Sequence, residues 1–169
     1  MTDPQSYLNH VASFEEVAWG IALIAITMNI HAFGMLFTVS AGEAMQRRLV
    51  ATASYFANLR VLVLTSWAIV FVHLAEVMVW AGFFVWRDAM PSLSAAFYFS
   101  LLQYVTVGSE LTLPVHWRLL GGFIGMAGLL TFAWSTTVLL RIAQDFERKQ
   151  LQNIAKLRHL GNQSDSGAP

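Results

Sequence analysis

The chain has 169 residues, of which 56% are hydrophobic and 12% charged, and its mean hydropathy is +0.55. Because a soluble domain carries about 25% charged residues, this composition indicates a membrane protein. The formal net charge of zero gives no sign of a nucleic-acid partner. The absence of cysteine excludes disulfides, thiolate metal sites and thiol catalysis.

Three segments are long and apolar enough to cross a bilayer: residues 17–40, 61–86 and 119–142. Each exceeds the roughly 20 residues that a helix needs to cross about 30 Å of hydrocarbon. Residues 1–16 form a flank before the first span, and residues 41–60 connect the first two spans. We therefore expect an all-α membrane protein with three transmembrane helices.

A fourth apolar segment, residues 93–104, is too short to span. It follows Pro91-Ser92, and Ser92 is a suitable N-cap for a helix that begins there. A helix of this length between two spans is typical of a re-entrant or interfacial segment. Residues 105–111 then form a polar loop before the third span.

Charged residues predict the orientation in the membrane. Basic residues follow the first and third spans: Arg47, Arg48, Arg60, Arg141, Arg148, Lys149, Lys156 and Arg158. Since positive residues mark the cytoplasmic side, we expect the connection 41–60 and the C-terminus to be inside and the flank 1–16 outside. Residues 143–160 are predicted to form a cytoplasmic helix, and the polar residues 161–169 a disordered tail.

Two short runs flank the start of the third span: Tyr104-Val105-Thr106-Val107-Gly108 in the loop and Trp117-Arg118-Leu119-Leu120-Gly121 at the turn into the span. With their neighbours they resemble the pore module of two-span potassium channels and their small bacterial relatives, the first run being similar to the family's run into its Thr-Val-Gly filter and the second to the turn into its inner helix. The resemblance covers about residues 60–142. It implies a homotetramer in which residues 61–86 form the outer helix, 93–104 the pore helix, 105–111 the filter and 119–142 the inner helix.

The same resemblance implies that Thr106, Val107 and Gly108 supply rings of oxygen that replace the hydration shell of an ion. The sequence then departs from the family, because Ser109 and Glu110 replace the aromatic residue and the second glycine. We expect a shortened filter below a ring of four Glu110 carboxylates. Glu110, with Gly108 beneath it, is the predicted metal-ion site.

The carboxylate ring suggests which ion passes. Two carboxylates about 8 Å apart repel by about 2 kcal/mol at an effective dielectric constant of about 20. A divalent cation relieves this repulsion, and Ca²⁺ accepts oxygen ligands in flexible geometry. Ca²⁺ or a mixture with Na⁺ and K⁺ is therefore expected, with strict K⁺ selectivity as the alternative. An exposed Glu110 without a role in selection is the simpler reading.

Three polar side chains are predicted to support the filter from behind. His73 and Glu76 lie three residues apart on one face of the second span, where ionisable groups are costly. They are expected to pair with each other, or Glu76 to accept hydrogen bonds from the pore helix, whose last residue is Tyr104. His31, in the first span, is read as a hydrogen-bonded interior residue.

Four glycines lie near the start of the third span: Gly121, Gly122, Gly125 and Gly128. One reading is close helix packing of the kind that small residues allow. The other is a gating hinge, for which Gly125 and Gly128 are the candidates. The sequence leaves both readings open.

Together these features predict a tetrameric cation channel of the bacterial inner membrane. It is expected to be no enzyme and to need no cofactor; its partners are copies of itself, the lipid bilayer and the permeant cations Ca²⁺, K⁺ or Na⁺. A more distant alternative is a haem-binding electron-transfer subunit, because His31, His73 and His116 are intramembrane or interfacial. A membrane scaffold or sensor with a degenerate pore is the third reading.

Overall fold

The computed structural model describes residues 13–49 and 55–165, which form helices and contain no strand. In chain order the elements are α2 (Phe14–Leu49), α3 (Tyr55–Trp86), α4 (Leu93–Tyr104), a short 3₁₀ turn η2 (Val115–Trp117) and α5 (Leu120–Asp165). The expected all-α class is confirmed for this part of the chain.

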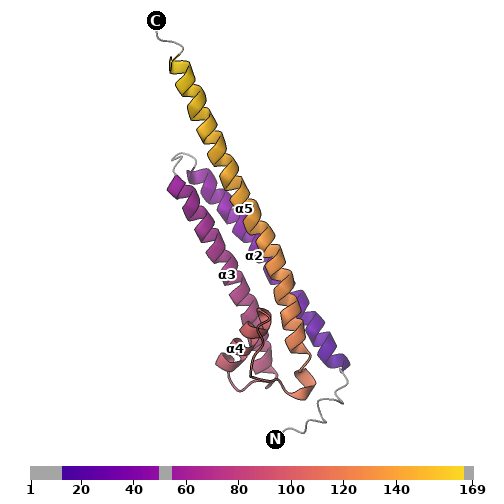
Figure 1. The fold of residues 1–169 in the computed structure, drawn as a ribbon. Helices are drawn as coiled ribbons and strands as arrows, with labels where there is room; N and C mark the ends of the chain where they lie inside the picture. The colour runs from indigo at the N-terminus through magenta and orange to yellow at the C-terminus, as the bar shows by residue number, and fades with distance from the viewer. Residues whose placement is uncertain (1–12, 50–54, 166–169) are drawn as a thin grey trace.

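Three helical segments are long and apolar enough to cross a membrane: Phe14–Met45, Leu59–Trp86 and Val115–Arg148. They lie in α2, α3 and α5, which run side by side (Figure 1) and pack against one another. The chain is therefore a multi-pass membrane protein with the three predicted spans. Many large apolar side chains on these helices are exposed, as expected of surfaces that meet lipid or another subunit.

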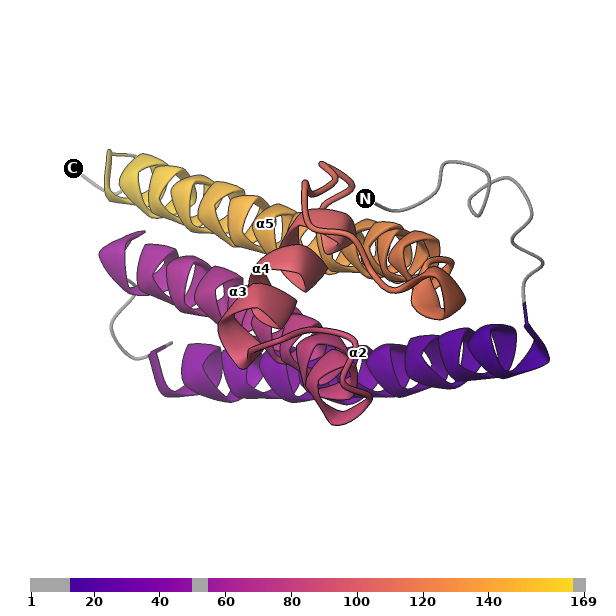
Figure 2. The ribbon, with the colours of Figure 1, turned by 90° about the horizontal axis from the view of Figure 1, so that it is seen from below.

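The short helix α4 lies at the end of the bundle where α3 ends and α5 begins. Seen toward that end, it lies between α3 and α5 (Figure 2), and it packs against both. Its bounds are those predicted from the sequence. Ser92 is the N-cap, and its Oγ accepts a hydrogen bond from the backbone N–H of Ala95 at 3.2 Å.

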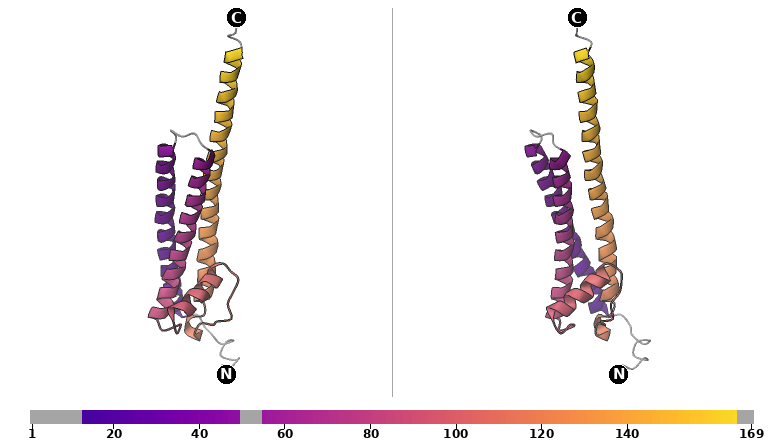
Figure 3. Two further views of the ribbon diagram at one scale, coloured as in Figure 1. Left: turned by 90° about the vertical axis from the view of Figure 1, so that its left-hand side faces the viewer. Right: turned by 60° about the vertical axis from the view of Figure 1, so that its left-hand side comes forward.

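After α4 the chain leaves the helical conformation and returns to the end of the bundle where η2 and α5 begin (Figure 3). An apolar core joins the four helices at this end. Its fully buried members include Trp80, Phe84, Leu120 and Ile124. The indole N–H of Trp80 donates to the Thr27 hydroxyl at 3.0 Å, which ties α3 to α2.

The structure corrects two boundaries at the far end of the bundle. Residues 120–142 and 143–160 belong to one continuous helix, α5, so the predicted cytoplasmic helix is an extension of the third span and the boundary at 142 is not a break. The predicted disordered tail is also wrong for residues 161–165, which belong to α5; residues 166–169 lie outside the described part. An established helix extends at little cost, since each added residue brings one hydrogen bond without a new nucleation step.

The connection between the first two spans is also more helical than expected. Helix α2 continues to Leu49 and α3 begins at Tyr55, so most of residues 41–60 extend the two spans. Residues 50–54 and the flanking residues 1–12 lie outside the described part.

Candidate functional site

Five buried or nearly buried side chains form a closed ring of polar contacts inside the bundle. His31 comes from α2, His73 and Glu76 from α3, Tyr104 from the last turn of α4, and Ser135 from α5. His31 and Glu76 have no exposed surface, Tyr104 is 1% exposed and Ser135 6%. All four α-helices of the described part of the chain therefore contribute to one site, which we call the polar ring.

Each member of the polar ring contacts the next. His31 Nδ1 lies 2.8 Å from Glu76 Oε1, and the Tyr104 hydroxyl donates a short hydrogen bond to Glu76 Oε2. The Tyr104 oxygen lies 2.8 Å from His73 Nδ1. Ser135 Oγ closes the ring, 3.0 Å from His73 Nε2 and 3.4 Å from His31 Nε2.

The hydroxyl of Thr131 attaches to the ring from α5. It lies 2.5 Å from the Tyr104 oxygen and is also within hydrogen-bond distance of the carbonyls of Ala127 and Gly128. The aromatic side chain of Phe132 packs on the His73 imidazole, with ring centroids 4.7 Å apart. Tyr104 is thus held by polar contacts to α3 and α5 at the C-terminal end of α4.

Only the two histidines can balance the Glu76 charge from within the spans. Residues 17–42, 61–86 and 119–140 contain no Lys or Arg, and Glu76 is their only acid. A lone carboxylate in a low-dielectric interior is costly unless it is paired and hydrogen-bonded. The polar ring supplies both requirements.

The ligand atoms of His31, His73 and Glu76 lie within 4.8 Å of one another, a spacing that is also compatible with an ion. However, both nitrogens of each imidazole contact another member of the polar ring. Among the described buried side-chain atoms, only Ser100 Oγ lacks a hydrogen-bond partner. Each nitrogen therefore has a contact within the protein without a metal ion, and neither imidazole presents a free nitrogen to a haem.

The loop after α4 begins with a helix cap of the Schellman type. The backbone N–H of Thr106 donates to Gln103 O at 2.9 Å, and that of Val107 donates to Leu102 O at 3.0 Å. Thr106 has a φ of 61°, a conformation that is costly for a β-branched residue. Gly108 has a φ of 84°, which glycine adopts readily.

The predicted filter residues all lie in this loop, directly after α4. Thr106 and Glu110 are exposed, as is Val107 with 73% of its surface, while Gly108 and Ser109 are half-buried. Ser109 Oγ accepts a hydrogen bond from the backbone N–H of Leu111 at 3.0 Å. In the isolated chain these residues enclose no path, and their role as an ion filter stays a prediction.

Glycines of α5 pack against α4 beside this loop. A Cβ at Gly128 would lie 2.0 Å from the carbonyl oxygen of Tyr104, and one at Gly125 would lie 3.5 Å from that of Gln103. Gly128 therefore allows the end of α4 to approach α5. This supports the packing reading, and the hinge role of Gly125 and Gly128 stays a prediction.

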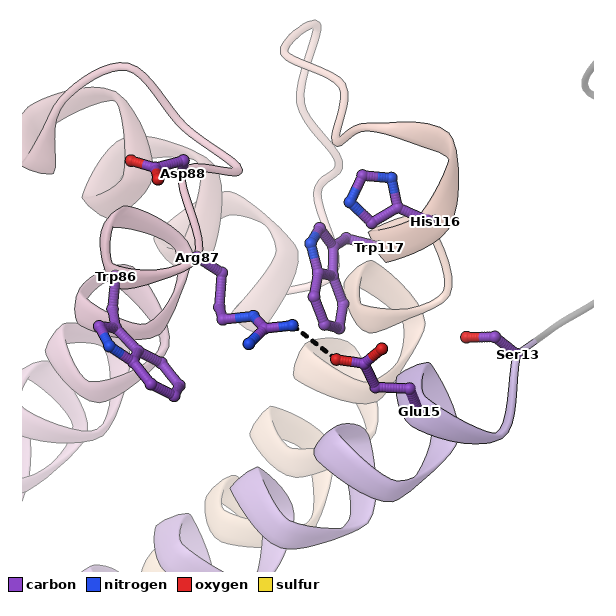
Figure 4. Close-up of a pocket in the computed structure, with 7 residues that line it drawn as sticks. All are labelled: Ser13, Glu15, Trp86, Arg87, Asp88, His116 and Trp117. Atoms are coloured by element: carbon purple, nitrogen blue, oxygen red, sulfur yellow. Dashed lines mark hydrogen bonds and ion pairs between the residues drawn. The ribbon is translucent and has the colours of Figure 1, made fainter.

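A second polar feature lies at the end of the bundle near α4 (Figure 4), where a cavity of about 290 Å³ is lined by Ser13, Glu15, Trp86, Arg87, Asp88, His116 and Trp117. The Arg87 guanidinium donates to Glu15 at 2.5 Å and lies 4.9 Å from the ring centroid of Trp117. These contacts join α2, the end of α3 and the turn before α5.

The sequence predicted that His73, Glu76 and Tyr104 lie together behind the filter, and the structure brings these three side chains together. It did not predict the contact between His31 and Glu76, which are 45 residues apart. Nor did it predict the contacts of Ser135 with His73 and His31, which are 62 and 104 residues away. It also missed buried Glu16, whose Oε1 accepts a hydrogen bond from Leu119 N at 2.5 Å. The signals available were the ionisable residues themselves, His31 alone in the first apolar segment and Glu16 directly before it.

No protein-family model, no curated protein and no solved structure matches this chain.

Proposed function

We propose that this protein is a homotetrameric cation channel of the bacterial inner membrane, in which α4 is a re-entrant pore helix and residues 105–111 line the narrow part of the path. The proposal rests on the position of Tyr104 along the spans, about halfway across the hydrocarbon layer. Tyr104 ends α4 and contacts Glu76, which lies ten residues before the end of α3 at Trp86. Ten residues of helix correspond to about 15 Å, about half of the hydrocarbon thickness.

The length of α4 agrees with this depth. Its 12 residues correspond to about 18 Å of helix, so α4 extends from the end of α3 to the level of Glu76. The chain then continues in non-helical conformation. Non-helical backbone at membrane depth is tolerated only where it is buried in protein or lines a watery path. Since Thr106 and Val107 are exposed on the single chain, further copies would have to enclose them.

The charge around this path favours cations. The C-terminal end of a helix carries a partial negative charge, and α4 directs that end toward the interior of the bundle. Four copies would place four such ends around one axis. Exposed Glu110 adds a carboxylate from each copy at the outer side, and rings of acidic side chains select cations in channels.

Two observations concern the ion. Ser109 and Glu110 replace the residues that complete a potassium filter, which supports passage of Ca²⁺ or of mixed monovalent and divalent cations. Thr106-Val107-Gly108 and the positive φ of Gly108 support the second candidate, a K⁺-selective channel. The distribution of basic residues supports an N-terminus outside and a cytoplasmic C-terminus.

The test is reconstitution of the purified protein in liposomes or planar bilayers, with reversal potentials measured in K⁺, Na⁺ and Ca²⁺ gradients. We expect cation current with measurable Ca²⁺ permeability. High selectivity for K⁺ over Na⁺ without Ca²⁺ current would favour the second candidate. Absence of any cation current from a correctly folded tetramer would reject the channel proposal.

A further inference from the structure

We propose that the polar ring of His31, Ser135, His73, Tyr104 and Glu76 is a binding site for a single proton, and that this proton joins α2 to the pore-forming part of the chain. Proton binding follows from the geometry of the ring alone. Its consequence for ion flow rests on the proposed channel function, and the two are tested separately.

The polar ring has more contacts than it has hydrogen atoms to fill them. The ring has five members and five contacts, from His31 through Glu76, Tyr104, His73 and Ser135 back to His31. Each contact needs one hydrogen between its two heavy atoms. With an ionised Glu76 and two neutral imidazoles, the four other side chains supply one hydrogen each. Four hydrogens for five contacts leave one contact in which a lone pair faces another lone pair. The complete ring therefore requires one further proton.

The net charge of the polar ring also favours one further proton, independently of the number of hydrogen atoms. An ionised Glu76 with two neutral imidazoles has a net charge of −1, in spans that contain no Lys or Arg. One further proton makes the ring neutral, whether it lies on an imidazole or on the carboxyl group. A second further proton would restore a net charge. Hydrogen bonding and burial therefore favour the same state.

The titratable groups that face the ring come from three of the four packed elements. They are His31 from α2, His73 and Glu76 from α3, and Tyr104 from α4. Helix α5 contributes the hydroxyls of Ser135 and Thr131 and no titratable group. A phenol has an ordinary pKa near 10, so the proton is exchanged by the two imidazoles and the carboxyl group.

The distances show where the ring opens when the proton leaves. The longest contact is that between Ser135 Oγ and His31 Nε2, at 3.4 Å. Four hydrogens satisfy the other four contacts if Ser135 donates to His73 and the His73 Nδ1–H donates to Tyr104. Loss of the proton therefore separates His31 of α2 from Ser135 of α5 and leaves Tyr104 attached to α3. The first span is in this way coupled to the helix that follows the filter.

The direct test counts the proton at neutral pH in the full-length protein in lipid nanodiscs. Nitrogen NMR of labelled histidines reports the charge of each imidazole, with His31→Gln and His73→Gln used for assignment. Infrared difference spectra against Glu76→Gln report the carboxyl group. We expect either one imidazolium with a carboxylate, or two neutral imidazoles with a protonated carboxyl group. Two neutral imidazoles with a carboxylate, or two imidazoliums, would overturn the proposal.

Ser135→Ala gives a sharper test because it removes no titratable group. It deletes two of the five contacts, and the remaining three are satisfied by His31, Tyr104 and His73 in their neutral forms. The further proton then completes no contact, and we expect it to bind at least about tenfold more weakly. Thr136→Ala is the matched control, since its exposed hydroxyl bonds only to Phe132 O of its own helix. Equal proton affinity in the two variants would overturn the proposal.

Ion flux then tests the coupling. If the proton controls the pore, the pH midpoint of cation flux follows the midpoint of proton binding, and Ser135→Ala shifts both to lower pH while Thr136→Ala shifts neither. Midpoints that move independently would reject the coupling. A protein without flux that still binds one proton would reject the channel proposal and leave the proton site established.

Discussion

The carbonyl oxygen of Tyr104 occupies the space that a Cβ at Gly128 would need, 2.0 Å from it. The contact joins the end of α4 to α5 through backbone atoms, which cannot move aside as a flexible side chain can. Gly128→Ala is therefore expected to displace α4 and to destabilise the protein by at least about 1–3 kcal/mol, the usual cost of overpacking. Thermal unfolding in detergent, followed by circular dichroism, measures the change.

Gly122→Ala is the control for this substitution. A Cβ at Gly122 meets no atom within 4 Å, and alanine favours a helix over glycine by up to about 1 kcal/mol. We expect equal or higher stability for this variant. If Gly128→Ala were as stable as Gly122→Ala, the close approach of α4 and α5 would be wrong.

Tyr104→Phe removes one hydroxyl from the polar ring and keeps the aromatic packing. It leaves Glu76, His73 and Thr131 each without one buried partner. We expect a loss of about 1–3 kcal/mol, the cost of buried polar groups that lose a hydrogen bond. Tyr98→Phe, on the same helix but 55% exposed, should unfold at nearly the wild-type temperature. A similar effect of both variants would contradict the buried position of Tyr104.

Glu16 and Glu15 are neighbours in the first turn of α2 with different surroundings. Glu16 is fully buried and accepts from the backbone N–H of Leu119, just before α5. Glu15 is 60% exposed and pairs with Arg87. We expect Glu16→Ala to cost about 1–3 kcal/mol, whereas Glu15→Ala should cost about 0–1 kcal/mol, because exposed ion pairs contribute little. Chemical denaturation of both variants in mixed micelles checks the order.

Glu110→Gln tests the proposed outer cation site. Replacing the carboxylate by an amide removes one negative charge per chain from the loop, and we expect block of the Na⁺ current by Ca²⁺ to weaken by about tenfold, equivalent to about 1.4 kcal/mol. Glu43→Gln removes an equal charge from an exposed position at the other end of the bundle, where Glu43 pairs with Arg47. Unchanged block in Glu110→Gln, or equal loss in both variants, would show that Glu110 does not bind the ion.

The local parts of the fold were predictable from sequence, and the contacts between distant segments were only partly so. Helix α4 was predicted within its bounds because Ser92 is a local start signal and the apolar run after it is short. The closeness of His73 to Glu76, with Nδ1 3.6 Å from Oε2, was predictable because residues three apart share a helix face. The partnership of His31 with Ser135 was not, since it depends on how α2 and α5 rotate against each other.

The extent of α5 failed for a different reason. Composition predicted disorder after residue 160, but a helix that has already formed gains one hydrogen bond with each added residue and needs no new nucleation step. The positive φ of Thr106 was also unpredictable, because a β-branched residue is a poor choice for a helix cap. It reflects the path that the chain must take after α4.

The unbroken course of α5 has a mechanical consequence. Gly128, beside the end of α4, and Asp165 belong to one helix without an interruption, and 37 residues of helix correspond to about 56 Å. The segment beyond α2 and α3 (Figure 1) therefore acts as a lever arm. A tilt of about 5° about Gly128 would move the far end by about 5 Å on that length. A force applied to the far end of α5 would in turn be delivered as torque at the contact between Gly128 and Tyr104.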